Sequence, residues 1–155
     1  MIKNKKLNIA IVGLGNIGLN LYEHLIKYKK TINEKTNINL EVRYVSAKSR
    51  FKKRRIKIPK KKWLKNCFKV SKLKDIDIVV ELIGGAEGTA KRLVFDSIKN
   101  KKHVVTANKE VMAKFGSDLL ALAKRNNVRL LFEASVGGAI PIIGNLSNDL
   151  IANKV

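Results

Sequence analysis

Cysteine is nearly absent from this sequence of 155 residues, which contains only Cys67. One thiol excludes a disulfide framework and fits a reducing compartment, and we expect Cys67 to be a small buried or half-buried apolar residue. Long apolar runs are missing too, because no stretch approaches the ~20 residues that a membrane span requires. The first residues, MIKNKK, lead into a strand pattern and not into the apolar core of a signal peptide. We therefore expect a cytoplasmic protein without a membrane segment.

Acidic residues are also scarce, with 12 Asp and Glu against 33 Lys and Arg, so the formal net charge is +21. By itself this charge favours a nucleic acid or an anionic membrane surface as partner. The lysines are spread along the whole chain, however, and the one dense cluster, Lys52 to Lys62, has no aromatic residues interleaved for stacking on bases. We expect a solvated, lysine-rich surface and no specific nucleic-acid binding.

What the sequence does contain is a strand, a glycine turn and a helix that begin at Leu7. The apolar run of the strand ends at Gly13, and Asn16 to Lys29 has helical periodicity. In a dinucleotide-binding turn of this kind, Gly13 allows the sharp reversal, Gly15 leaves room for a pyrophosphate, and Gly18 lets the helix pack closely on the strand. The first helical turn would then direct its N–H groups at the phosphates. The helix is expected to bury Ile17, Leu21, Leu25 and Ile26.

The second strand carries the expected determinant of cofactor type at its tip. The polar stretch from Lys29 to Asn39 lacks apolar periodicity and predicts a loop, and Leu40 to Ala47 alternates as a strand does. An NAD-preferring domain usually places an acidic residue after this strand, but here Lys48, Ser49 and Arg50 follow it. These side chains suit the additional phosphate of NADP, so we expect NADP in preference to NAD, with Arg54 as a further candidate contact.

Two later strands also end beside candidate site residues. Asp77 to Leu82 is a near-continuous apolar run, typical of a parallel strand covered on both faces, and Ile83, Gly84 and Gly85 follow it before a helix from about Thr89 to Lys99. Lys102 to Thr106 predicts a strand, and Lys109 stands at the start of a helix that runs to about Asn126. Ligands of open parallel sheets bind at the carboxyl ends of the strands. The two glycines are therefore candidates for the ribose or nicotinamide side of the cofactor, and Lys109 is a candidate for stabilising negative charge on a substrate oxygen. A plain turn and a surface lysine remain the alternatives.

The remaining segments complete an α/β pattern. Phe51 to Phe68 predicts an excursion at the sheet edge, in which Trp63 serves as a local core anchor. Val128 to Phe132 predicts the last strand, and a closing helix is expected from about Ile142 to Ile151. Between them, Glu133 to Pro141 is a glycine-rich turn that is either structural or a cation site built from carbonyls and one carboxylate. The whole pattern predicts a doubly wound, mostly parallel sheet with helices on both faces.

Four motifs in order, GLGNIG, VVELIGG, HVVTANKEVMA and LLFEASVGGAIPII, resemble the N-terminal NAD(P)-binding part of homoserine dehydrogenase. That family interconverts aspartate 4-semialdehyde and homoserine with NADP, on the route to threonine, methionine and isoleucine. The resemblance implies a Rossmann-like fold and places Lys109 beside the nicotinamide and the substrate. It also implies a monovalent cation, sodium, held by Glu133 and by main-chain oxygens near Val136, Gly138 and Ile140. The implied cofactor contacts are Gly13, Leu14, Gly15, Asn16, Ile17, Gly18, Lys48, Ser49, Arg50, Arg54, Ile83, Gly84, Gly85, Thr106 and Lys109.

The resemblance also implies a division into domains. Residues 1–141 would form the NAD(P)-binding domain, and residues 142–155 would begin the connection to a substrate and catalytic domain beyond Val155. We therefore expect the cofactor half of an enzyme that is a homo-oligomer at full length, incomplete for catalysis by itself. An arginine-type contact of the family appears here as Lys48, which keeps the charge and loses bidentate geometry. The alternatives are a cofactor-binding module without chemistry and a basic nucleic-acid-binding protein.

Overall fold

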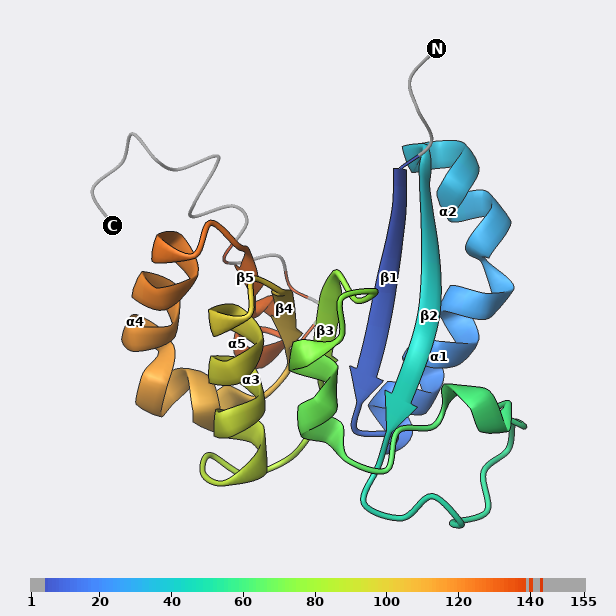
Figure 1. The fold of residues 1–155 in the computed structure, drawn as a ribbon, viewed down its shortest axis with the longest axis horizontal. Helices are drawn as coiled ribbons and strands as arrows, with labels where there is room; N and C mark the ends of the chain where they lie inside the picture. The colour runs from blue at the N-terminus through green and yellow to red at the C-terminus, as the bar shows by residue number, and fades with distance from the viewer. Residues whose placement is uncertain (1–4, 139, 141–142, 144–155) are drawn as a thin grey trace.

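The computed structural model describes residues 5–138, 140 and 143, and they contain a five-stranded parallel sheet (Figure 1). The strand order is β2-β1-β3-β4-β5. From β1 the chain moves outward to β2, returns to β3 on the other side of β1, and continues outward to β5, so the winding reverses between β1 and β3. This confirms the doubly wound α/β fold. The strands are β1 (Lys5–Val12), β2 (Ile38–Ser46), β3 (Ile78–Glu81), β4 (His103–Thr106) and β5 (Leu130–Leu131).

Both faces of the sheet are covered by helices. Successive residues of β1 point to opposite faces, and the side chains on each face are buried. Ile9 and Ile11 pack with Tyr22 of α1 (Asn16–Lys27) on one face. Ala10 and Val12 turn to the other face, which is covered by the 3-10 turn η2 (Cys67–Lys72), α3 (Thr89–Lys99) and α4 (Lys109–Arg125). Each fully buried branched side chain contributes about 1.5–3 kcal/mol to folding. With both faces packed, the loops at the carboxyl ends of the strands are left to form a site.

The orientation of α1 differs from the prediction. Leu21 and Leu25 pack against the core as expected, but Ile17 and Ile26 are 65% and 50% exposed. The buried positions are Gly18 and Tyr22, one turn apart. A close backbone contact at Gly18 therefore decides which side of the helix faces the sheet, and hydrophobic periodicity carries no information about such a contact.

The prediction of a loop from Lys29 to Asn39 is wrong, because a second helix, α2 (Lys29–Thr36), follows α1 directly. No residue of α2 is buried, which explains the lack of apolar periodicity. The helix lies beside β2, Lys30 is 3.8 Å from Glu34 one turn later, and Asn37 ends the helix in the left-handed conformation with φ of 55°.

The C-terminal part of the described chain is also more helical than predicted. β5 has only two residues, fewer than the strand expected over Val128 to Phe132. Residues Glu133–Val136 form a short helix, α5, so the glycine-rich turn begins at Gly137. The helix predicted from Ile142 to Ile151 lies outside the described residues, apart from Ile143.

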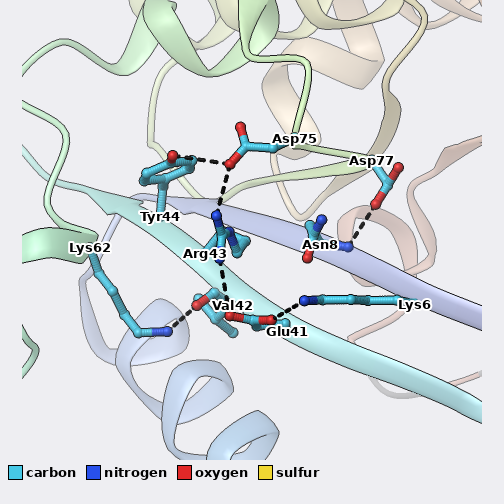
Figure 2. Close-up of polar contacts among 9 residues, drawn as sticks. All are labelled: Lys6, Asn8, Glu41, Val42, Arg43, Tyr44, Lys62, Asp75 and Asp77. Carbon is cyan, nitrogen blue, oxygen red and sulfur yellow. Dashed lines mark hydrogen bonds and ion pairs between the residues drawn. The ribbon is translucent and has the colours of Figure 1, made fainter.

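The segment after β2 folds back along the outer edge of that strand. Trp63 pairs with Val45 in a parallel bridge, and the N–H of Leu64 donates to the carbonyl of Val45 at 2.9 Å. Lys62, the last residue of the 3-10 turn η1 (Lys60–Lys62), donates from Nζ to the carbonyl of Val42 (Figure 2). These contacts confirm the excursion at the sheet edge and the anchoring role of Trp63.

A β-bulge in β2 gathers polar side chains at the end of the sheet opposite the glycine turns. Ile9 pairs with Val42 but Ala10 pairs with Tyr44, so Arg43 is the extra residue. Arg43 and Tyr44 consequently both reach Asp75, at 3.2 and 3.1 Å (Figure 2). The hydrogen bonds to Asp75 raise the pKa of Arg43 and of Tyr44. This cluster joins β2 to the loop that precedes β3.

Within the described residues, none of the helices combines the length and the apolar character needed to cross a bilayer.

Candidate functional site

The glycine turn after β1 is built around two glycines that leave no room for a side chain. Gly13 has φ of 103°, and a methyl group on its Cα would lie 2.3 Å from the carbonyl oxygen of Leu82. A methyl group on Gly18 would lie 1.9 Å from the carbonyl oxygen of Gly13. The turn can therefore close only with glycine at these two positions, and the closure brings the start of α1 against the end of β3.

Gly15 differs from the other two glycines because space lies in front of it. Within the described residues, a methyl group at Gly15 would meet no atom within 4 Å apart from its own chain neighbours, and its φ of −74° is open to any residue. Gly15 is the N-cap of α1 and offers no side chain to the first-turn N–H groups, and that turn contains no acidic residue. The positive end of a 12-residue helix thus faces open space, which is the arrangement that an anionic phosphate group requires.

A pocket of about 240 Å³ lies beside this turn, at the carboxyl ends of β3 and β4. It brings together Ile17, the turn from Ile83 to Gly85, and Lys109, which the sequence analysis named separately. The exposure of Ile17, unexpected for an inner-face residue, is explained by its place in the wall of this pocket. The complete lining is Ile17, Leu82, Ile83, Gly84, Gly85, Ala107, Asn108, Lys109 and Glu110.

Thr106 is placed behind the pocket wall and not in it. It is fully buried, its hydroxyl donates to Glu81, and its own oxygen accepts from the N–H of Asn108 at 3.0 Å. The hydroxyl of Ser135 donates to the carbonyl of Thr106 at 2.9 Å, which ties α5 to the same point. The hydroxyl of Thr106 therefore connects protein groups to one another.

Glu81 and Asn108 are site residues that the sequence reasoning missed. Glu81 is completely buried at the last position of β3, where burial raises the pKa of its carboxyl against the opposing effect of its hydrogen bonds. It accepts from the N–H of Ile83 at 2.6 Å. The signal in the sequence was a carboxylate at the end of an apolar strand, three residues before Gly84, which apolar periodicity alone does not single out.

Asn108 links the two sides of the pocket. Its Nδ2 donates to the carbonyls of Ile83 and Gly85, both at 2.8 Å. Its Oδ1 accepts from the N–H of Val111 at 3.1 Å and so caps the start of α4. One carboxamide therefore fixes both the turn after β3 and the helix whose first residue is Lys109.

The tip of β2 lies next to the glycine turn but outside the pocket. The N–H of Gly13 donates to the carbonyl of Ser46 at 2.9 Å, so the loop that carries Lys48, Ser49 and Arg50 borders the turn. Lys48 and Ser49 are exposed and Arg50 is half-buried.

Arg54 organises this loop from within. Its guanidinium donates to the carbonyls of Ser49, Arg50 and Lys52 at 2.7 to 3.0 Å. It also lies 4.9 Å from the ring centre of Trp63. The structure thus places Arg54 as a clamp that shapes the loop after β2.

The predicted cation ligands belong to one short segment at the end of the described chain. Glu133 begins α5, and its Oε1 accepts from the N–H of Ile143 at 2.9 Å. Val136 and Ile140 are exposed, and Gly138 turns the backbone with φ of 46°. Carboxylate and main-chain oxygens are ligands that hard cations prefer. In the described part of the chain, no group of three or more His, Cys, Asp or Glu side chains forms a metal cluster.

Comparison with known proteins agrees with this geometry. The sequence model described as "Homoserine dehydrogenase, NAD binding domain" matches residues 13–133. The homoserine dehydrogenases of Bacillus subtilis and Neisseria gonorrhoeae are 36% and 38% identical over 151 residues, or 97% of this chain. A crystal structure of the Thiobacillus denitrificans homoserine dehydrogenase, 35% identical, superposes over 96% of this chain with a TM-score of 0.84. The chain spans only 34 to 35% of the length of these relatives.

Proposed function

The chain belongs to the homoserine dehydrogenase family, and on that premise we propose that it binds a nicotinamide dinucleotide along the carboxyl edge of its sheet. The observation that carries the proposal is the contrast among three glycines. Protein atoms surround Gly13 and Gly18, whereas Gly15 faces open space at the start of α1. This is the room that a pyrophosphate needs at a helix N-terminus.

The reversal of winding between β1 and β3 sets the direction of the bound nucleotide. Dinucleotides lie across this switch point, with one half on each side of the first strand. The adenosine half would lie by the tip of β2, and the nicotinamide half would enter the pocket formed by Ile17, the turn from Ile83 to Gly85, and Lys109. Leu14 and Asn16 complete the stretch of backbone that borders the pyrophosphate.

The charge at the tip of β2 supports NADP as the cofactor, with NAD as the alternative. Lys48 and Arg50 carry positive charge and Ser49 carries a hydroxyl, which together suit a 2′-phosphate. Arg54 supports this role by fixing the carbonyls of Ser49 and Arg50, and with them the course of the loop.

Lys109 is the proposed catalytic residue of this chain. It occupies the first position of α4, where the helix dipole disfavours a cation by roughly 0.3–1 kcal/mol, and it lines the pocket. An ammonium group there can stabilise the negative charge that develops on a carbonyl oxygen. The nicotinamide, when bound, would supply the hydride for interconversion of aspartate semialdehyde and homoserine. In this proposal residues 1–141 form the NAD(P)-binding domain, and a substrate domain and homo-oligomer assembly complete the enzyme.

The donor set at Glu133 fits a monovalent cation, and we assign sodium to Glu133 and the carbonyls of Val136, Gly138 and Ile140. A bound cation would hold the turn after α5 in place. Thermal unfolding in NaCl should occur at higher temperature than in an equal concentration of KCl, and Glu133→Gln should remove the difference. Equal unfolding temperatures in the two salts would contradict the assignment.

Calorimetric titration of the chain with NADPH and, separately, with NADH tests the proposed function. We expect saturable one-to-one binding that is tighter for NADPH. Absence of binding by either nucleotide would refute the proposal. A second assay, oxidation of NADPH in the presence of aspartate semialdehyde, distinguishes an active enzyme from a cofactor-binding module: turnover by this chain would exclude the module.

A further inference from the structure

Glu81 is a buried carboxyl group whose presence is not explained by direct contact with a cofactor, because it does not line the pocket. It is 0% exposed at the end of a central strand, and its described partners are hydrogen-bond donors of Ile83 and Thr106. Placing a carboxyl group in a protein interior without a cationic partner is costly, and an apolar residue of similar size would fill the space at no such cost. The cost indicates that the carboxyl group does something besides filling the core.

The partners of Glu81 show what it holds. One oxygen accepts from the N–H of Ile83 at 2.6 Å, in the turn after β3. The other accepts from the hydroxyl of Thr106, whose oxygen in turn accepts from the N–H of Asn108 at the start of α4. Asn108 returns two hydrogen bonds to the turn after β3, at Ile83 and Gly85. The result is a closed ring of hydrogen bonds that joins the two walls of the pocket from behind.

We propose that Glu81 is a positioning residue for the nicotinamide half of the cofactor. It sets the separation between the turn from Ile83 to Gly85 on one wall and Lys109 on the other. Because Glu81 is fully buried, it acts through these groups and does not touch the ligand. The inference rests on the proposed function, since it assumes that a dinucleotide occupies the pocket.

The adenosine half of the site is held mainly by other contacts. Its turn depends on close backbone packing at Gly13 and Gly18, which at Gly13 reaches the carbonyl of Leu82, and its loop is held by Arg54 on backbone carbonyls and Trp63. Loss of the Glu81 carboxyl group should therefore affect the two halves of the cofactor unequally. A general loss of folding would affect both halves together.

The test compares two ligands, NADPH and adenosine 2′,5′-bisphosphate, the second of which lacks the nicotinamide half. Kd values are measured by calorimetry for wild type, Glu81→Gln and Glu81→Leu. Gln keeps the size of Glu, but only one of its two terminal polar atoms can accept hydrogen bonds. Leu keeps the approximate volume and accepts no hydrogen bond. We expect the ratio of the NADPH Kd to the bisphosphate Kd to rise about threefold in Glu81→Gln and about tenfold in Glu81→Leu, as for the loss of one or two hydrogen bonds.

Ser71→Ala is the matched control. Ser71 is also buried and polar, and its hydroxyl donates to the carbonyl of Phe68 at 2.9 Å in η2, away from the pocket. Its ratio should equal that of wild type. If Glu81→Leu does not fold, Glu81→Gln decides the test.

An unchanged ratio in the Glu81 variants, or an equal loss of affinity for both ligands, would overturn the inference. Failure of the wild type to bind either ligand would instead refute the proposed function, and the inference with it. Equal affinity of the wild type for both ligands would show that the nicotinamide half is not held, which also overturns the inference.

Discussion

Gly15 and Gly18 belong to one motif, but at the residue scale they have opposite physical roles. At Gly15→Ala the new methyl group would point into open space, so the free energy of unfolding should change by less than about 1 kcal/mol. NADPH affinity should fall at least about tenfold, because the methyl group would occupy space assigned to the pyrophosphate.

Gly18→Ala is the comparison for this experiment. Its methyl group would lie 1.9 Å from the carbonyl oxygen of Gly13, so we expect the free energy of unfolding to fall by about 2 kcal/mol or more. Urea denaturation and calorimetric titration measure the two effects separately. Full NADPH affinity in a folded Gly15→Ala protein would contradict the placement of the pyrophosphate.

Lys48 and Arg50 are expected to recognise the 2′-phosphate that distinguishes NADPH from NADH. The double variant Lys48→Ala, Arg50→Ala should weaken the binding of NADPH by about tenfold or more and the binding of NADH by much less. Only NADPH carries the 2′-phosphate, and a charge-assisted hydrogen bond contributes roughly 1.5–3 kcal/mol. Binding of both nucleotides is measured under the same salt conditions.

The control for Lys48 and Arg50 removes two positive charges elsewhere in the same loop. Lys53 and Lys57 are exposed, and Lys53→Ala, Lys57→Ala should leave the NADPH to NADH ratio unchanged. An equal decrease for both nucleotides in the Lys48, Arg50 variant would show that the phosphate is not recognised there.

Sequence reasoning could name individual candidate residues where the residue type itself carries the information. The three glycines, Lys109 and the basic tip of β2 could be named because turns, phosphates and oxyanions restrict which residues can serve. Glu81 could not, since its role depends on Thr106 and Asn108, which lie 25 and 27 positions away in the chain. A buried hydrogen-bonded ring is visible only once the strands are in register.

At the scale of secondary structure elements, α4 connects the fold to the site through its first turn. Asn108 caps this helix with Oδ1 and holds the facing turn with Nδ2. Asn108→Ser should keep the cap and lose the contacts to Ile83 and Gly85, whereas Asn108→Ala should lose both. We expect Ala to be less stable than Ser by about 1 kcal/mol, and both variants to bind NADPH more weakly than wild type.

Asn66→Ala provides the control at another helix start. The side chain of Asn66 accepts from the N–H of Phe68 at 2.9 Å and caps η2, far from the pocket. This variant should lose stability and keep its NADPH affinity. If Asn108→Ser bound NADPH as tightly as wild type, the link between the two pocket walls would have no role in binding.

Elements were predicted correctly where burial produces a pattern and incorrectly where it does not. α3 has the predicted bounds because it buries five of its residues, whereas no residue of α2 is buried, so α2 carries no apolar pattern. The rotation of α1 could not be predicted, since it follows from a backbone contact at Gly18 with no hydrophobic signature.

At the scale of the whole molecule, the net charge of +21 opposes folding through repulsion among the lysines. Added salt screens this repulsion over distances of about 10 Å at 0.1 M. The midpoint of thermal unfolding should therefore rise by a few degrees between about 20 and 300 mM KCl, as measured by circular dichroism. A midpoint that does not depend on the salt concentration would contradict this prediction.

The same charge predicts how nucleic acids behave with this protein. Any binding in a gel-shift titration should lack sequence preference and fall steeply with salt, because it arises from the lysine background. Sequence-specific binding at physiological ionic strength would revive the nucleic-acid alternative.

The return of the chain along β2 has a consequence for behaviour in concentrated solution. An uncovered outer strand presents a row of amide and carbonyl groups that can recruit strands of other molecules and seed fibrils. Here Lys62 donates to the carbonyl of Val42 and the N–H of Leu64 donates to the carbonyl of Val45. Trp63 pairs with Val45 in a parallel bridge. Residues 62–64 thus leave fewer free backbone groups at this part of the edge for a strand of another molecule to pair with.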